Sequence, residues 1–178
     1  GALVVCCDQR RAALAACGTV DAFVHAAGFM RTAALGDLDP DACEAMWRLH
    51  VAAAERLANG LSPGMAAGAR IVLVGSRTAQ GAAGRSQYAA TKAALVAMAR
   101  SWAIELAPRG VSVNVVAPAA TDTPMLAGPG RSATPPRLPP MGRYIRPEEV
   151  AGAVAFLLSP EAAMITGQTL TICGGASL

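Results

Sequence analysis

The sequence predicts an α/β fold, in which a parallel sheet carries helices on both of its faces. The main evidence is an alternation of two patterns along the 178 residues. Short apolar, β-branched runs indicate buried strands, and alanine-rich stretches with helical spacing separate them. Strands and helices that alternate in this way form parallel sheets covered on both sides. The length suits one domain, residues 1–178, and the sequence contains no repeat that would suggest a second.

Strands are expected at Ala2–Cys6, Ala22–His25, Arg70–Gly75, Val111–Val116 and Thr169–Ile172. Helices are expected at Arg10–Cys17, Asp41–Asn59, Gln87–Ala107 and Pro147–Leu158. Local signals support several boundaries: Asp39-Pro40 is typical of a helix start, and Gly110 of a helix end. Proline followed by two glutamates at Pro147 indicates the start of the last helix.

The segment Ala127–Pro140 departs from the alternation. It contains five prolines and two glycines, so no regular element is expected there. Long loops within compact domains are commonly functional, and two interpretations remain open. The segment is either a lid over a binding site or a rigid surface loop.

Composition excludes several classes of protein. Apolar residues make up 53% and charged residues 15%, a balance typical of a packed chain rather than a disordered one. The net charge of +3 is spread thinly, so we expect no nucleic-acid partner. The longest charge-free stretch, from Ala162 onward, contains Thr166, Gly167 and Gln168, so we expect no membrane span. The five cysteines form no Cys-x-x-Cys pair, which favours reduced thiols in a cytoplasmic protein without a zinc site.

The candidate chemistry lies at predicted strand ends. Tyr88 and Lys92 are four residues apart on a predicted helix, so both project from one face. Ser76 follows one strand, Ala26-Ala27-Gly28 follows another, and Pro118–Thr123 follows a third. The carboxyl ends of parallel strands meet at one edge of a sheet, where open α/β sheets bind their ligands. We therefore expect these residues to line one cleft.

Together these motifs resemble the short-chain dehydrogenase/reductase family, whose members have a Rossmann-like, doubly wound sheet in three α/β/α layers. Tyr88-x-x-x-Lys92 resembles the family's catalytic pair, and Ser76 its catalytic serine. His25-Ala26-Ala27-Gly28 resembles its Asn-Asn-Ala-Gly segment, and Pro118–Thr123 its Pro-Gly turn beside the nicotinamide, with Ala119 replacing glycine. Ile165-Thr166-Gly167-Gln168 and Gly174-Gly175 resemble the C-terminal strand.

The resemblance implies an oxidoreductase that interconverts a ketone and a secondary alcohol with NAD or NADP, with no preference evident. Tyr88 would be the general acid or base, and Ser76 would bind the substrate oxygen. An unperturbed tyrosine has a pKa of about 10, and an ammonium about 5 Å away would favour the phenolate by roughly 3 kcal/mol at an effective dielectric of about 20. Lys92 would supply that charge. The implied cofactor contacts are Asp8, Ala26, Ala27, Gly28, Tyr88, Lys92, Pro118, Ala119, Thr121 and Thr123.

One departure from the family lies on the predicted helix Asp41–Asn59. His50 stands where the family has a fourth catalytic residue, an asparagine. Two interpretations remain open. His50 keeps a water relay for proton delivery, since imidazole both donates and accepts hydrogen bonds, or it is a buried core histidine.

A second departure is at the start of the sequence, where no Gly-rich phosphate turn occurs. We align Asp8 with the family's acidic residue beside the adenine, so that the first two strand–helix units are missing. Two alternatives remain. Ala2–Cys7 would fill the central strand position, or Asp8 would end the second strand and select NAD over NADP.

Competing functions follow from these departures. The first alternative is a related scaffold without cofactor binding, acting as a binding or assembly subunit. An epimerase or dehydratase with the same Tyr-x-x-x-Lys pair is the second alternative to the oxidoreductase.

The substrate would be a small carbonyl compound or alcohol, in an apolar site near Met125 and Met141. By resemblance, a homodimer or homotetramer would form through Asp41–Asn59 and Gln87–Ala107.

Overall fold

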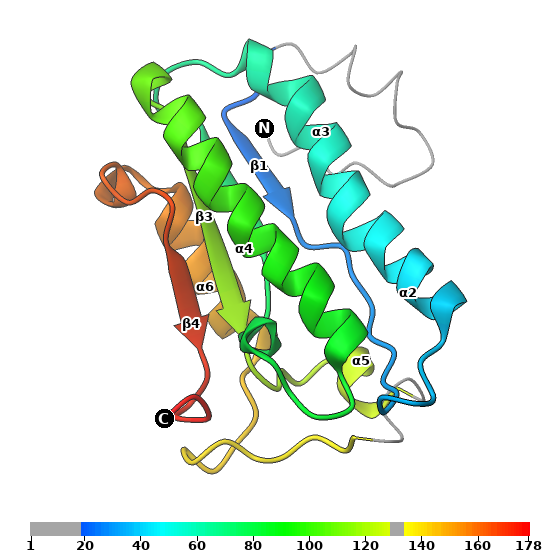
Figure 1. Cartoon of the computed structure of the whole chain (residues 1–178). Coiled ribbons are helices and arrows are strands. Elements are labelled where there is room, and N and C mark those ends of the chain that lie inside the picture. Colours follow the sequence, from blue (N-terminus) through cyan, green and yellow to red (C-terminus); the bar gives the residue numbers. More distant parts are fainter. Residues whose placement is uncertain (1–18, 129–133) are drawn as a thin grey trace.

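A single parallel sheet forms the centre of the molecule. The computed structural model describes residues 19–128 and 134–178 (Figure 1). Strands β1 (Ala22–His25), β2 (Arg70–Val74), β3 (Ser112–Pro118) and β4 (Thr169–Ile172) pair in the order β1-β2-β3-β4. All three pairings are parallel, which confirms the predicted fold class. The expected strand Ala2–Cys6, the expected helix Arg10–Cys17 and Asp8 lie outside the described residues.

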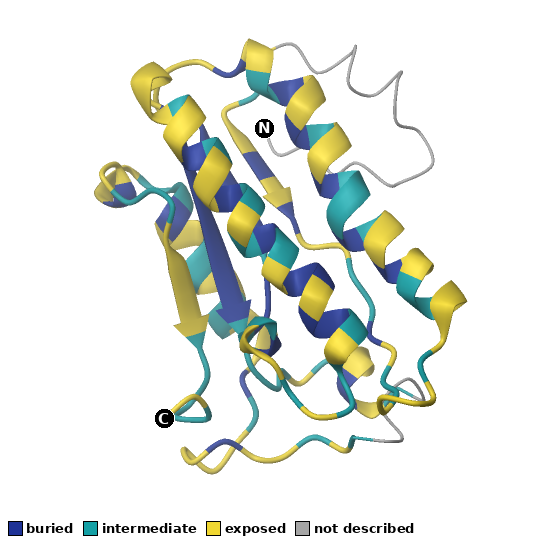
Figure 2. Ribbon diagram, viewed as in Figure 1, coloured by how far each residue is buried: buried dark blue, intermediate teal, exposed yellow. Residues whose placement is uncertain are grey.

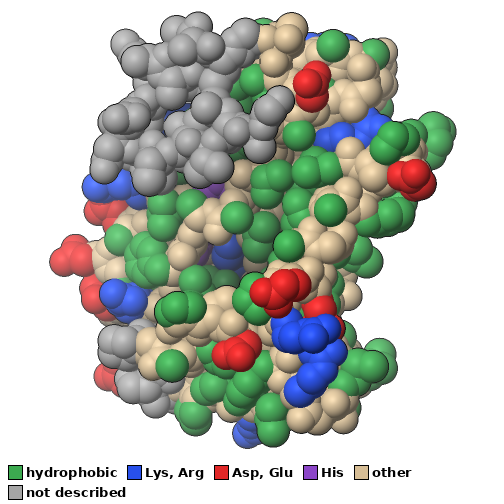
Figure 3. All heavy atoms as spheres, turned by 180° about the vertical axis from the view of Figure 1, so that it is seen from behind, with side chains coloured by type: hydrophobic (Ala, Val, Ile, Leu, Met, Phe, Trp, Pro, Cys, Tyr) green, Lys and Arg blue, Asp and Glu red, His purple; other side chains and the backbone are tan. Residues whose placement is uncertain are grey.

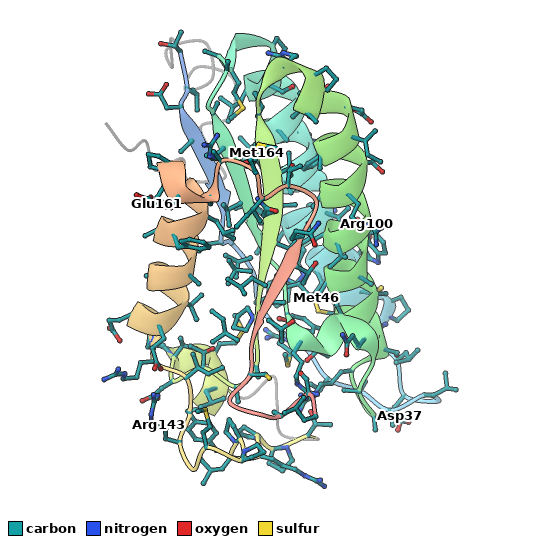
Figure 4. The ribbon with its side chains drawn as sticks, turned by 90° about the vertical axis from the view of Figure 1, so that its left-hand side faces the viewer. Asp37, Met46, Arg100, Arg143, Glu161 and Met164 are labelled. Atoms are coloured by element: carbon teal, nitrogen blue, oxygen red, sulfur yellow. The ribbon has the colours of Figure 1, made fainter. Side chains whose placement is uncertain are left out.

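Helices cover both faces of this sheet, and Figure 4 shows the layers from the side. One face carries α2 (Pro40–Trp47), α3 (Ala53–Leu61) and α4 (Ser86–Leu106). The other carries α6 (Pro147–Leu158), whose predicted bounds are confirmed. The larger core cluster joins the first face to α3 and α4 through side chains such as Ile71, Leu95 and Val113. Buried and exposed residues alternate along these helices, as Figure 2 shows.

The helix expected over Asp41–Asn59 is interrupted. Asp39 caps its start, since Oδ1 accepts hydrogen bonds from the backbone N–H groups of Asp41 (2.9 Å) and Ala42 (3.3 Å). One π-helical turn, Arg48–Ala52, then separates α2 from α3. A π turn rotates the residues that follow it relative to an α-helix, and such turns often lie at functional sites. This turn contains His50.

The face covered by α6 is less completely packed. Val24 of β1 is 38% exposed, and Phe156 of α6 is 45% exposed. Figure 3 shows this face, where exposed apolar side chains stand among charged ones of both signs. In the described ranges, none of the helices has the length and hydropathy needed to cross a membrane.

The segment after β3 contains one short helix, α5 (Pro124–Ala127). Residues 134–140 contain no helix or strand, which confirms the prediction for that part of the proline-rich segment. They pass beneath the carboxyl ends of the strands in the view of Figure 1. This position brings them to the edge of the sheet where the candidate site lies.

Candidate active site

The carboxyl ends of β1, β2 and β3 meet at one edge of the sheet, beside a cavity of about 770 Å³. The cavity brings together residues that were predicted separately: Ser76, Tyr88, Lys92, Ala26, Gly28, Pro118, Ala119, Thr121 and Thr123. Ala27 is exposed and His50 is fully buried, and neither of them lines it. Met125 lines the cavity, whereas Met141 is 79% exposed and lies outside it.

Ser76 is fixed by its place between a strand and a short helix. It lies two residues after the end of β2 and is 8% exposed. Its Oγ accepts a hydrogen bond from the backbone N–H of Thr78 (3.1 Å) and so caps the 3₁₀ turn Arg77–Gln80. A hydroxyl that accepts one bond still has its proton to donate. Ser76 is therefore able to donate to an oxygen atom in the cavity.

Tyr88 and Lys92 lie one turn apart on α4, which places both at the cavity. The Tyr88 side chain packs with Met30 and Met46 and is 6% exposed. The Lys92 ammonium lies 5.8 Å from the centre of the Tyr88 ring and donates to the carbonyl of Val74 (2.9 Å). Burial lowers the pKa of Lys92 from 10.5 to about 8. The lysine is thus mostly protonated at pH 7, with its charge beside the tyrosine.

His50 connects three segments from a fully buried position. Its Nε2 accepts the backbone N–H of Phe29 (3.1 Å), so this nitrogen carries no proton. Its Nδ1 lies 2.8 Å from Thr91 Oγ1, and the Thr91 hydroxyl donates to the carbonyl of Tyr88 (2.8 Å). The Nδ1–H tautomer is the only neutral form that satisfies all three bonds. Burial first, and then the charge of Lys92, lower the pKa of His50 from 6.5 to about 3.

His25 ends β1 beside the same network. It is 3% exposed, and its Nε2 has no hydrogen-bond partner within the described part of the chain. Burial lowers its pKa from 6.5 to about 4, with a smaller contribution from Lys92. Two uncharged histidines therefore lie near the buried lysine at neutral pH.

Gly28 leaves room for this arrangement. A Cβ atom at this position would lie 3.1 Å from His50 Nε2 and 3.5 Å from Lys92 Nζ. The glycine in the turn after β1 therefore allows the histidine and the lysine to approach the backbone closely.

The proline-rich loop is attached to the start of α4. Arg85 donates through Nε to Thr134 Oγ1 and through Nη2 to the Thr134 carbonyl, each at 3.2 Å. Gly84 has a φ of +69°, and a Cβ there would lie 2.6 Å from Thr134 Cγ2. In residues 19–128 and 134–178, no group of three or more His, Cys, Asp or Glu side chains is placed to hold a metal ion.

Comparison with known proteins identifies the family. A family model described as Enoyl-(Acyl carrier protein) reductase matches residues 8–177. The chain is 39% identical over 165 residues to 3-oxoacyl-[acyl-carrier-protein] reductase FabG of Vibrio harveyi, covering 89% of this chain and 67% of that protein. It is 40% identical over 164 residues to the FabG of Vibrio cholerae serotype O1, with the same coverage. The chain belongs to the short-chain dehydrogenase/reductase family.

Solved structures of this family agree with the fold. A dehydrogenase/reductase from Sinorhizobium meliloti 1021 is 34% identical, with a TM-score of 0.83 over 94% of this chain and 68% of that one. A short chain dehydrogenase from Burkholderia cenocepacia J2315, in complex with NADP, is 36% identical, with a TM-score of 0.79 over 90% and 67%. The chain thus spans about two thirds of the length of these relatives. The predicted Rossmann-like class and the family assignment are confirmed.

Several residues of the site were not predicted from the sequence. A role for Thr91 was not predicted, because the motif Tyr88-x-x-x-Lys92 specifies only its first and last residues and Thr91 belongs to no other motif. Three arginines, Arg77, Arg85 and Arg137, also line the cavity. The position of Arg77 directly after Ser76 was the one signal that could have indicated a role for it.

Proposed function

We propose that this chain forms the catalytic part of an NAD(P)(H)-dependent oxidoreductase that interconverts a ketone and a secondary alcohol. The observation that carries the proposal is that Ser76, Tyr88 and Lys92 line one cavity at the carboxyl ends of parallel strands. The named activity of the FabG relatives supports a 3-oxoacyl reductase or a related alcohol dehydrogenase. The NADP complex of the Burkholderia enzyme supports the cofactor class.

The residues around the cavity fit a nicotinamide cofactor. Ala26 and Gly28 at one side, and Ala119, Thr121 and Thr123 at another, have small side chains that allow a flat ring to approach the backbone. Lys92 uses one of its three N–H groups on Val74, which leaves two for a ribose hydroxyl. The cofactor, when bound, supplies or accepts the hydride. Asp8 remains a predicted contact outside the described residues.

Proton movement would take place at Tyr88 Oη. In reduction, the tyrosine gives its proton to the oxygen of the substrate, and in oxidation it takes the proton back. The Lys92 charge favours the tyrosinate in this buried position. Ser76 donates to the same substrate oxygen and stabilises the charge that develops there.

His50 serves as a positioning residue in this proposal. Both of its nitrogens are already used, by Phe29 and by Thr91, so it has no lone pair or proton left for a relay. Protonation of Nε2 would break the bond from Phe29. The histidine thus replaces the family's asparagine by holding the turn after β1 against α4.

The test is the pair of variants Tyr88→Phe and Tyr144→Phe. Tyr144 is the other tyrosine of the chain and does not line the cavity. Tyr88→Phe should lower kcat by about 10²–10⁴-fold and leave cofactor affinity nearly unchanged, because it removes only the proton donor. Tyr144→Phe should leave both unchanged. The assay follows NADH or NADPH absorbance with a 3-oxoacyl thioester and a simple ketone.

Two results would reject the proposal. Full activity in Tyr88→Phe would remove the tyrosine from the chemistry. Failure of both NADH and NADPH to bind at millimolar concentration, measured by fluorescence titration, would favour the scaffold without cofactor.

We also propose a homo-oligomer, in line with the predicted use of the long helices. Ala90, Ala93, Ala97 and Ile104 of α4 are exposed on the side away from the sheet, and Ile104 is 77% exposed. Figure 2 shows exposed residues along this helix. The small side chains allow close packing of a second copy. Mass measurement by light scattering distinguishes a monomer from a dimer or tetramer.

A further inference from the structure

The charges around the cavity are of one sign. Four basic side chains line it, and no acidic residue of the described chain does. They are Arg77, Arg85, Lys92 and Arg137. The whole sequence has 15 basic and 12 acidic residues, so this separation is specific to the cavity. A hollow lined by one sign of charge concentrates ligands of the opposite sign.

The arginines come from segments other than the turns predicted to contact the cofactor. In the sequence, Arg77 and Arg85 lie between Ser76 and Tyr88, and Arg137 belongs to the proline-rich loop. Arg85 joins these two segments through its bonds to Thr134. The turns assigned to the cofactor, Ala26–Gly28 and Pro118–Thr123, contribute no basic side chain.

Arg77 has an unused donor next to the reacting centre. It follows Ser76 directly, and its Nε is buried without a hydrogen-bond partner among the described residues. A buried N–H group that remains unpaired is costly, and buried donors are nearly always satisfied. The guanidinium group presents paired N–H donors that match a carboxylate or phosphate. Because Nε is closed to solvent, an anionic group of a ligand in the cavity would bind the part of Arg77 that lines the cavity, and the positive lining favours such a group.

We propose that the substrate carries an anionic group, a carboxylate or a phosphate, a few bonds from its carbonyl carbon, and that Arg77 binds it. This inference rests on the proposed function and narrows its substrate class. Ser76 and Tyr88 hold the carbonyl oxygen, and Arg77 holds the anion beyond it. Arg85 is a positioning residue, held by Thr134. Arg137 adds positive charge from the loop.

Binding experiments test this without turnover. The ligands are 3-oxobutanoate, 3-oxobutyl phosphate and the neutral methyl 3-oxobutanoate, titrated by ligand-observed NMR against the whole chain. Arg77→Gln should weaken the preferred anion about 10- to 100-fold, as expected for hydrogen bonds to a charged group, and leave the ester unchanged. Arg77→Lys should keep part of the affinity, because it keeps the charge. Arg100→Gln, on the exposed side of α4, is the matched control and should change nothing.

The two anions distinguish a carboxylate from a phosphate substrate. Equal binding of the ester and both anions by the native chain would overturn the inference. The inference would also be overturned if Arg77→Gln weakened the binding of NADPH and left the binding of the anion unchanged, because Arg77 would then bind the cofactor and not the substrate. The chain could also prefer an anion through Arg77 and yet reduce no carbonyl compound. That result would support the inference and reject the proposed function. Thermal unfolding of both Arg77 variants confirms that they fold.

Discussion

The two buried histidines predict a loss of stability in mild acid. Folding lowers the pKa of His25 to about 4 and of His50 to about 3, from 6.5. The unfolded chain therefore binds more protons than the folded chain between pH 6.5 and these values. A depressed folded pKa gives stability that is present above pH 6.5 and is lost as the pH falls.

The magnitude follows from the shifts. At pH 5 both histidines remain neutral in the folded chain, whereas most unfolded chains have protonated them. Each pKa unit corresponds to about 1.4 kcal/mol, so acidification from pH 7 to pH 5 should cost about 2 kcal/mol per histidine. The combined loss of about 4 kcal/mol is a large part of the 5–15 kcal/mol that is typical for a domain.

Urea unfolding at pH 7, 6 and 5, followed by circular dichroism, measures this loss. With a slope of about 2 kcal/mol per molar urea, the midpoint should fall by roughly 2 M between pH 7 and pH 5. Glu149 titrates below 4.5 and Lys92 at about 8 or above, so neither of them contributes to this loss.

The double variant His25→Asn/His50→Asn is the control. Asparagine keeps hydrogen-bonding capacity without titrating, so the midpoint should become nearly independent of pH over this range. A native chain that loses less than about 1 kcal/mol between pH 7 and pH 5, against the expected 4, would refute the reasoning. An unchanged dependence of the urea midpoint on pH in the double variant would also refute it.

Two further changes test the contacts that hold the site. Thr91→Val removes the hydroxyl between His50 and Tyr88 and should lower the free energy of unfolding by about 1–3 kcal/mol, whereas Thr91→Ser should retain most of it; urea unfolding at pH 7 compares them. Gly84→Ala adds a Cβ 2.6 Å from Thr134 Cγ2 at a φ of +69°, so it should displace the loop and raise KM. Thr134→Ser in the same chain removes that methyl group and should restore part of the KM, and no change in KM for Gly84→Ala would contradict the role of the loop contact.

Strand and helix identities were largely predictable because the signals are local. The strand Thr169–Ile172 and the helix Pro147–Leu158 have the predicted bounds, and β2 ends one residue earlier than expected. The π turn was not predictable in the same way. Apolar spacing over Asp41–Asn59 is compatible with one continuous helix, and the widened turn depends on contacts that His50 makes with α4 and with the turn after β1. Those contacts involve residues far apart in the sequence.

The site was predictable where strand ends imply proximity. Ser76 lies just after β2 and Pro118 ends the neighbouring parallel strand β3, so sheet geometry alone brings them to one cavity. The direction of a side chain within a turn is not given by that argument. Ala27 was expected at the cofactor, yet it does not line the cavity, while its neighbours Ala26 and Gly28 do. Successive residues in an extended turn point to opposite sides, and the sequence does not specify which side faces the ligand.

The polar network gives a physical reason for a histidine at position 50, where the resemblance to the family predicts an asparagine. The backbone N–H of Phe29 needs an acceptor, and Thr91, whose own proton goes to the Tyr88 carbonyl, needs a donor. A side chain at position 50 must therefore accept on one side and donate on the other. Asparagine does so with its amide oxygen and nitrogen, and neutral histidine does so with Nε2 and Nδ1. A leucine would fill the space but leave two buried groups unpaired, whereas His50 pairs both of them.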